Sequence, residues 1–191
     1  MKKIISIMLI AILMFTASVI AEEEAIVDKV VYVEAWSDNE ETGHKAIDAI
    51  DGNITTRWCA QLFDETPCQL VLTFDKAYSF NTMNIAFNKP MARSYYFTLA
   101  ISMDGENWEM VPCEEEYFIS DVAYSNGEFS EIILPETITA QYLKFFGYGY
   151  YDFDEDAMKF GATDPNNGGP LSWFSFFEID IPVVDETAPI E

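Results

Sequence analysis

Three oxygen-bearing side chains lie close together in the sequence around a glycine. Asp51, Asn53 and Thr56 surround Gly52 in the segment of residues 49–58. Because glycine accepts a positive φ, the backbone can turn tightly here and direct carbonyl groups toward a common centre. Ca²⁺ prefers roughly six to eight oxygen ligands of mixed type. The spacing alone fits two interpretations, a calcium-binding loop or a polar β-turn whose Asp and Asn side chains bond their own backbone.

The N-terminus has the pattern of a secretory signal peptide. Lys2 and Lys3 precede an uncharged apolar stretch that ends at Ala21, and three glutamates follow. This pattern predicts cleavage after Ala21. An uncleaved anchor is the alternative, because about 18 apolar residues can just span a bilayer. The acidic residues after the stretch favour cleavage, so we expect a secreted or periplasmic protein with no membrane insertion once residues 1–21 are removed.

The charge of the chain argues against several partners. Ten basic residues stand against 33 acidic residues, for a net charge of −23. Nucleic-acid binding depends on basic side chains that neutralise phosphates, so no nucleic-acid partner is expected. The same charge disfavours anionic membranes and acidic polysaccharides unless a cation bridges them, and it fits a surface that holds divalent cations. Disorder is excluded, because 50% of the residues are hydrophobic and 15% are aromatic.

The cysteine and histidine content narrows the chemistry further. The chain has one histidine and no Cys-x-x-Cys pair, which argues against a zinc site and against most Cys-His or Ser-His nucleophiles. Cys59 and Cys68 bracket a short loop and could form a disulfide in an oxidising compartment, leaving Cys113 over. The sequence leaves this pairing open.

Short strands separated by turns must position these residues. Apolar and polar residues alternate in several segments, and the turn at residues 103–107 predicts a hairpin. After the signal peptide only residues 43–50 suggest a turn of helix. The even spacing predicts an all-β sandwich. The expected strands are residues 30–35, 69–74, 80–87, 95–102, 108–111, 129–134, 141–146 and 173–181.

One domain accounts for most of the mature chain. Its predicted limits are residues 30–181, after an N-terminal extension at residues 22–29. Residues 147–172 are expected to form a long irregular loop, rich in aromatic and acidic residues, of the kind that is functional or disordered. The proline-containing tail, residues 182–191, is expected to fray.

The order of several motifs resembles a known family. The motifs are Ala49-x-Asp51-Gly52-Asn53-x-x-Thr56-Arg57-Trp58, the strand with Leu70, Leu72 and Phe74, Ser102-x-Asp104-Gly105-x-x-Trp108, the strand Ala140-Gln141-Tyr142-Leu143-Lys144, and Trp173-x-Ser175-x-x-Glu178-Ile179. In order and spacing they resemble the coagulation factor V/VIII C-type, or discoidin, domain, and within it the family 32 carbohydrate-binding modules. The resemblance implies an all-β, eight-stranded, jelly-roll-like sandwich of the galactose-binding-domain-like type.

The resemblance also implies a structural Ca²⁺ near the ligand-binding edge. Carboxylates, a hydroxyl and backbone carbonyls would hold the ion. The implied ligands are Asp48, Asp51, Asn53, Thr56, Phe177 and Glu178. Two anionic ligands with several neutral oxygens suit Ca²⁺ better than Zn²⁺. The ion would connect the first long loop to the last strand, so its main effect would be on stability.

A sugar site is implied on loops at one end of the sandwich. Sugars stack on aromatic faces and bond to charged and amide groups. The candidates are Trp36, His44, Arg93 and Trp173. Alternatives stay open for three of them: a surface ion pair for Arg93, core packing for Trp173 and a solvated position for His44.

Two further residues of the first motif are interpreted as structural. Arg57 and Trp58 are tempting as ligand groups, but in the resembled family this pair usually packs beneath the calcium loop. Cys59 follows at a position where relatives often have a polar residue or His, so the sugar specificity is left open.

The function that this resemblance implies is binding without catalysis. We expect a secreted module that recognises a glycan or polysaccharide through loops at one edge of a calcium-stabilised sandwich. The alternative is an adhesion or assembly module whose loops bind a protein partner. Enzyme activity is not expected, because no pair of acids can be placed on facing strands.

Overall fold

A computed structural model describes residues 28–123 and 125–184. The expected signal peptide, most of the N-terminal extension and most of the C-terminal tail lie outside these described residues. Within them, no helix has the length and apolar character needed to cross a membrane.

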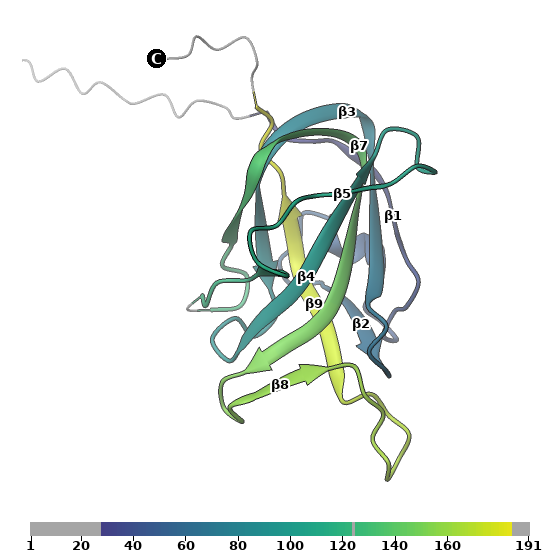
Figure 1. Cartoon of the computed structure of the whole chain (residues 1–191), viewed down its shortest axis with the longest axis vertical. Helices are drawn as coiled ribbons and strands as arrows, with labels where there is room; N and C mark the ends of the chain where they lie inside the picture. Colours follow the sequence, from purple (N-terminus) through teal and green to yellow (C-terminus); the bar gives the residue numbers. More distant parts are fainter. Residues whose placement is uncertain (1–27, 124, 185–191) are drawn as a thin grey trace, which may run out of the picture.

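β-Strands are almost the only regular secondary structure in the described chain, which confirms the all-β prediction (Figure 1). It contains nine strands rather than eight, and the only helix among the described residues is one 3₁₀ turn. The elements are β1 (Tyr32–Ser37), η1 (Ala46–Ala49), β2 (Trp58–Leu62), β3 (Cys68–Phe87), β4 (Arg93–Ser102), β5 (Glu109–Met110), β6 (Phe118–Ile119), β7 (Ser130–Asp152), β8 (Ala157–Phe160) and β9 (Ser172–Asp180).

The strands form one antiparallel sheet that curls around its core. Its order is β2-β9-β3-β7-β4-β5, with β1, β6 and β8 paired to β3, β4 and β7. β3 and β7 separate β4 from β9 within the sheet, yet the ring of Phe97 in β4 lies 6.1 Å from that of Phe174 in β9. These two strands therefore face each other across the core, and the curled sheet forms the expected β-sandwich.

The two longest strands each join segments that we expected to be separate. Residues 69–74 and 80–87 belong to β3, and residues 129–134 and 141–146 belong to β7. Pairing between these strands breaks twice, on either side of Tyr78 to Phe80, and then resumes. Pro135 lies in the unpaired part of β7, where its missing N–H costs no ladder hydrogen bond. Bulges therefore replace the turns that the sequence suggested.

The expectation of a long irregular loop at residues 147–172 is wrong for its first half. β7 continues through Asp152 and forms a hairpin with β8, with Tyr150 opposite Lys159. The tail also begins in an ordered way, because the N–H of Val184 donates to the carbonyl of Ser79 at 2.8 Å.

Aromatic side chains fill the core. Trp58 is completely buried between Phe174 and Phe176, as expected for a structural residue, with ring centroids 5.9 and 5.1 Å away. Phe87 stacks on Tyr95 at 5.3 Å. Aromatic pairs in such geometries add about 0.5–1.5 kcal/mol each beyond the area they bury. β2, β4 and β9, which frame the candidate site, are therefore anchored by rings.

All three cysteines are free, so Cys59 and Cys68 do not form the disulfide that the sequence left open. Both lie in the core. The thiol of Cys68 contacts the carbonyl oxygen of Gly147 at 3.5 Å, and that of Cys59 points toward its neighbour Ala60.

Candidate functional site

The first candidate feature is the loop between η1 and β2, where Asp51 organises the chain. Its Oδ1 accepts a hydrogen bond from the N–H of Asn53 at 2.9 Å, and its Oδ2 accepts one from Oγ1 of Thr56 at 2.7 Å. The same hydroxyl lies 2.8 Å from the carbonyl oxygen of Asn53. Gly52 has φ of +73°, the left-handed conformation that glycine accepts readily. The loop therefore gathers a carboxylate, a hydroxyl and a carbonyl around one turn.

Glu178 reaches this loop from β9. Its Oε2 accepts a hydrogen bond from the N–H of Gly52 at 2.8 Å, and the residue is only 8% exposed. Burial chiefly, with the nearby charge of Asp51 adding to it, raises the pKa of Glu178 to about 7. Among the described residues Glu178 has no cationic partner. A buried carboxylate beside a second one is the arrangement that a bound cation would stabilise.

The remaining members of the implied calcium set are less informative. The carboxylate of Asp48 accepts a hydrogen bond from the N–H of Lys45 at 2.9 Å and so caps η1, whereas the sequence assigned its carbonyl to the cation. Phe177 is buried in β9 beside Glu178. In the described part of the chain, no three His, Cys, Asp or Glu side chains lie close enough together to hold a metal ion, so any cation here would depend on neutral oxygens as well.

The second feature is a cavity of about 200 Å³ at the edge of the sandwich. It brings together Arg93 and Trp173, two of the four predicted ligand residues. Its lining residues are Glu41, Arg57, Cys59, Asn88, Lys89, Arg93 and Trp173. Arg93 begins β4 opposite Asp152, and Trp173 lies in β9 opposite Gln61 of β2. Segments far apart in the sequence thus meet at one rim.

Positive charge is concentrated in this cavity. Arg57, Lys89 and Arg93 are three of the ten basic residues of a strongly acidic chain. The guanidinium of Arg93 stacks on Tyr150 at 3.9 Å from the ring centroid, which fixes its plane. The Nε atoms of Arg57 and Arg93 are buried without a hydrogen-bond partner in the described structure. Such unpaired donors call for an acceptor from water or a ligand.

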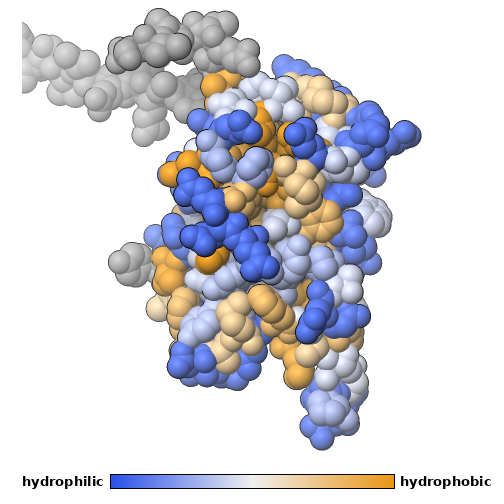
Figure 2. Space-filling view, in the orientation of Figure 1, coloured by the Kyte–Doolittle hydropathy of each residue, from blue (hydrophilic) through white to orange (hydrophobic). Residues whose placement is uncertain are grey.

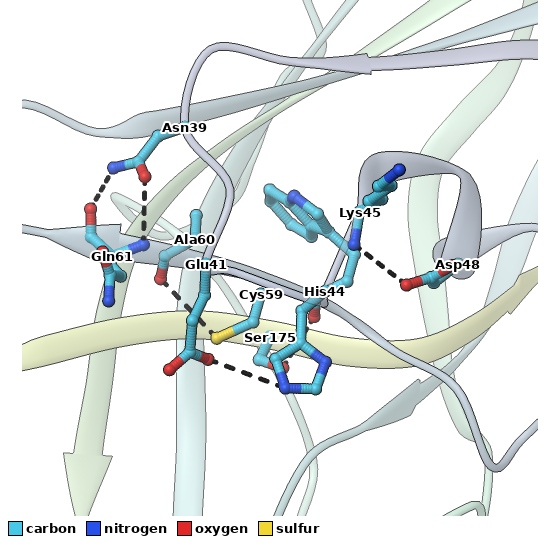
Figure 3. A network of polar contacts seen from close by, with 10 residues as sticks. Asn39, Glu41, His44, Lys45, Asp48, Cys59, Ala60, Gln61 and Ser175 are labelled. Carbon is cyan, nitrogen blue, oxygen red and sulfur yellow. Dashed lines mark hydrogen bonds and ion pairs between the residues drawn. The ribbon is translucent and has the colours of Figure 1, made fainter.

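His44 does not line this cavity. It lies next to Glu41 (Figure 3). Its Nε2 is 3.9 Å from Oε2 of Glu41, which does line the cavity. The Cys59 thiol, shown near Glu41 in Figure 3, has its pKa raised to about 12, first by burial and then by the hydrogen bond and charge of Glu41. At neutral pH the thiol of Cys59 is therefore protonated, and it lines the cavity without acting as a nucleophile.

Two residues lie at positions that the sequence did not suggest. Trp36 lies in β1 opposite Val71 and lines a different cavity, so it does not join Arg93 and Trp173. Arg57 lines the cavity although we interpreted it as a packing residue. Lys89 and Asn88, in the turn after β3, were missed because nothing in the sequence marks that turn as part of a site.

A larger groove, of about 530 Å³, lies beside β6 and the start of β7. Acidic and apolar residues line it, and it contains none of the predicted ligand residues. Its size alone does not make it the better sugar site, because it lacks the aromatic and cationic combination of the smaller cavity.

Comparison with known families and structures matches this fold. The F5/8 type C domain model matches residues 32–153. Comparison with curated proteins gave no match. Similar solved structures include a pectin-binding carbohydrate-binding module, with 24% identity over 85% of this chain and 96% of that one and a TM-score of 0.60. The CBM32 of AlyQ in complex with 4,5-unsaturated mannuronic acid has 18% identity over 81% and 97%, with a TM-score of 0.58.

A third similar structure is the family 32 CBM of C. perfringens NanJ in complex with galactose. It has 18% identity over 78% of this chain and 91% of that one, with a TM-score of 0.50. At these identities the likeness establishes the fold and leaves the ligand open.

Proposed function

The chain belongs to the F5/8 type C domain family, and on that premise we propose that it is a non-catalytic module that binds a glycan in the cavity lined by Arg57, Arg93 and Trp173. The observation that carries the proposal is the meeting of an aromatic side chain and two arginines, each with an unpaired Nε, at one rim. An indole stacks on the apolar face of a sugar, and guanidinium groups bond to its oxygens.

The cavity favours a sugar that carries an acidic group. Three cationic side chains surround it, whereas Glu41 is the only acidic residue among those that line it. Local charge therefore outweighs the net charge from which we argued against acidic polysaccharides. Two of the similar modules support the idea, since one is described as pectin-binding and another holds an unsaturated mannuronic acid.

A structural Ca²⁺ is part of the proposal. Asp51, Thr56 and Glu178 would hold it together with carbonyl groups of Asp48, Asn53 and Phe177. The fit rests on the buried carboxylate of Glu178, which pairs with no cationic side chain of the described residues and lies next to the oxygens gathered by Asp51. When bound, the ion would neutralise that pair of carboxylates and hold β9 to the loop before β2. It would brace the edge of the sandwich and would not contact the sugar.

Export of the protein remains an expectation from the N-terminal segment. The pattern of residues 1–21 supports secretion, and a surface-exposed or extracellular polysaccharide is the ligand that such a protein would meet.

Isothermal titration calorimetry tests the binding site. Galacturonate oligosaccharides should bind more tightly than neutral oligosaccharides of equal length. Arg93→Ala and Trp173→Ala should each weaken binding about tenfold or more, as expected when a charge-assisted hydrogen bond or a stacking contact is removed. Lys76→Ala is the matched control, because Lys76 is a cation that lies over Tyr78 rather than at this cavity.

Equal binding by the wild type and both cavity variants would overturn the proposal. Release of new reducing ends from the polysaccharide would overturn its non-catalytic part. Tight binding of a protein ligand with no glycan binding would instead support the adhesion alternative.

A further inference from the structure

The outward face of β7 carries a row of large side chains. Tyr142, Lys144, Phe146 and Tyr148 are alternate residues of this strand, and all four are half-buried. Alternate residues of a strand point to the same face and lie about 7 Å apart. The row therefore extends over about 20 Å. Shorter residues flank it on both neighbouring strands, with Ala100 on one side of Lys144 and Val71 on the other.

Aromatic side chains from other elements extend this row. Trp108, which follows the turn after β4, lies 6.5 Å from the ring of Tyr142. Tyr117 lies 4.9 Å from the ring of Tyr148 at the other end. Trp36 on β1 is 52% exposed and shares a cavity of about 320 Å³ with Trp108 and Lys144. Figure 2 shows hydrophobic patches between hydrophilic groups on the face over β4, β5 and β7.

Lys144 is the only cation in this row, and it has no acidic partner there. Its Nζ lies 3.8 Å from the ring centroid of Trp108 and 5.7 Å from that of Phe146. Within the described residues it forms no ion pair, whereas Lys29 and Lys159 each pair with a carboxylate. Burial lowers the pKa of Lys144. Glu34 lines the same cavity, but it does not come within ion-pair distance of Lys144. A half-buried lysine that pairs with no carboxylate is a position that an external anion would complete.

We propose that this row is a second glycan-binding surface, separate from the edge cavity, and that it holds an extended uronic-acid polysaccharide with one carboxylate on Lys144. Tyr142, Phe146 and Trp108 would stack against successive sugar rings, and Trp36 would cover the side of the chain opposite Trp108. Glu34, which lines the same cavity, would accept hydrogen bonds from sugar hydroxyls. The length of the row matches a linear chain rather than a single sugar.

This surface does not depend on the edge cavity. Trp36, Trp108 and Lys144 line one cavity, and Arg57, Arg93 and Trp173 line another, with no residue in common. One site can therefore be removed while the other is left intact, and failure of the proposed function at the edge is distinguishable from failure of the second surface.

The test is calorimetric titration of the protein and its variants with trigalacturonate, hexagalacturonate and neutral cellohexaose. Lys144→Met keeps most of the length of the side chain and removes its charge, and Trp36→Ala truncates a ring that is 52% exposed. Each should weaken hexagalacturonate binding about tenfold and reduce the preference over cellohexaose. Lys76→Met is the matched control, because it removes the charge of another lysine that lies over a tyrosine ring.

Chain length provides an independent readout. Hexagalacturonate should bind markedly more tightly than trigalacturonate to the wild type and to Arg93→Ala, and this difference should disappear in Lys144→Met and Trp36→Ala. If both variants bind like the wild type at every length, the row is only an aromatic ladder that stabilises the sheet, and the inference is wrong. If Arg93→Ala abolished binding while Lys144→Met and Trp36→Ala bound like the wild type, the edge cavity would be the glycan site. That result would also overturn the proposal of a second surface.

Discussion

The backbone N–H of Gly52 donates a hydrogen bond to Oε2 of Glu178 at 2.8 Å, although 126 positions separate the two residues in the sequence. This contact connects the loop before β2 to the last strand at the edge that carries the candidate sugar cavity. It holds a buried carboxylate next to Asp51, and no cationic side chain of the described residues pairs with it. The edge is therefore the part of the fold whose stability should respond most to an added divalent cation.

Calcium should stabilise the folded protein. At a free Ca²⁺ concentration of 100 Kd, binding to the native state alone adds about 2.7 kcal/mol to the free energy of unfolding, or roughly 5–10 °C in Tm for a domain of this size. Thermal unfolding followed by calorimetry, with calcium and then with EDTA, measures this difference. An unchanged Tm on addition of EDTA to the calcium-loaded protein would rule out the ion.

Glu178→Gln should remove most of this calcium response. The variant keeps the shape of the side chain and its capacity to accept a hydrogen bond from Gly52, but it lacks the charge that a cation needs. Glu65→Gln, at an exposed loop position, is the matched control and should respond to calcium like the wild type. A full calcium response in Glu178→Gln would place the ion elsewhere.

The sequence motifs predicted the residues of the candidate cation loop more completely than the residues that line the neighbouring cavity. The first motif placed Asp51, Asn53 and Thr56 in one turn, and the last placed Glu178 and Trp173 on the strand that reaches them. Trp36 was misplaced because we expected the first strand to end at residue 35. β1 instead runs to Ser37, and a bulge between Tyr32 and Glu34 sets which of its side chains face outward.

Arg57 was considered as a ligand group and then interpreted as structural, although the structure places it in the lining of the cavity. Arg57 directly precedes β2, whose first three residues are all buried, so strand alternation gives no signal for its position. The turn with Asn88 and Lys89 had no signal either, because only the curled sheet brings it to the same rim.

Arg57→Ala should weaken glycan binding about as much as Arg93→Ala, by tenfold or more, because both guanidinium groups line the same small cavity. The loss should be larger for uronate than for neutral sugars, since the lost group is a cation. Titration calorimetry with trigalacturonate measures it, and Lys76→Ala is again the control. Wild-type affinity in Arg57→Ala would return this residue to the structural role that we first gave it.

The strand boundaries illustrate what local sequence cannot supply. Tyr78 and Pro135 lie among residues that suggest turns, yet both belong to long strands, because bulges absorb the irregular residues while pairing resumes beyond them. Whether a polar segment becomes a turn or a bulge depends on whether a partner strand continues alongside it. In this protein the partner is distant in sequence, so the alternation of apolar residues could not reveal it.

Gly147→Ala should destabilise the fold. Gly147 lies in β7 where an added Cβ would be 2.4 Å from the ring of Phe174, well inside contact distance. Because Phe174 is fully buried among other rings, the clash cannot relax easily, and we expect a loss of about 1–3 kcal/mol in the free energy of unfolding. Urea unfolding measures this quantity.

A second substitution checks the cause of that loss. Phe174→Leu alone should destabilise the protein because it leaves space in the core, but in the double variant it should recover part of the loss caused by Gly147→Ala. Strictly additive effects in this double-mutant cycle would show that the ring of Phe174 is not what Gly147 accommodates.

The three cysteines should differ in reactivity in the folded protein. Burial first, and then the hydrogen bond and charge of Glu41, raise the pKa of Cys59 to about 12, and burial likewise raises the pKa of Cys68. The thiolate is the reactive form, and a raised pKa means that neither thiol ionises appreciably near neutral pH. Cys113 is partly exposed and should react first with a disulfide reagent.

The expected thiol titration in native buffer gives one fast thiol, with the other two appearing only in denaturant. Cys113→Ser should abolish the fast phase and leave the slow one unchanged. If the native wild type instead showed no reactive thiol and denaturation without reductant released only one, Cys59 and Cys68 would be joined as a disulfide after all, and the packing of β2 against β3 would have to be revised.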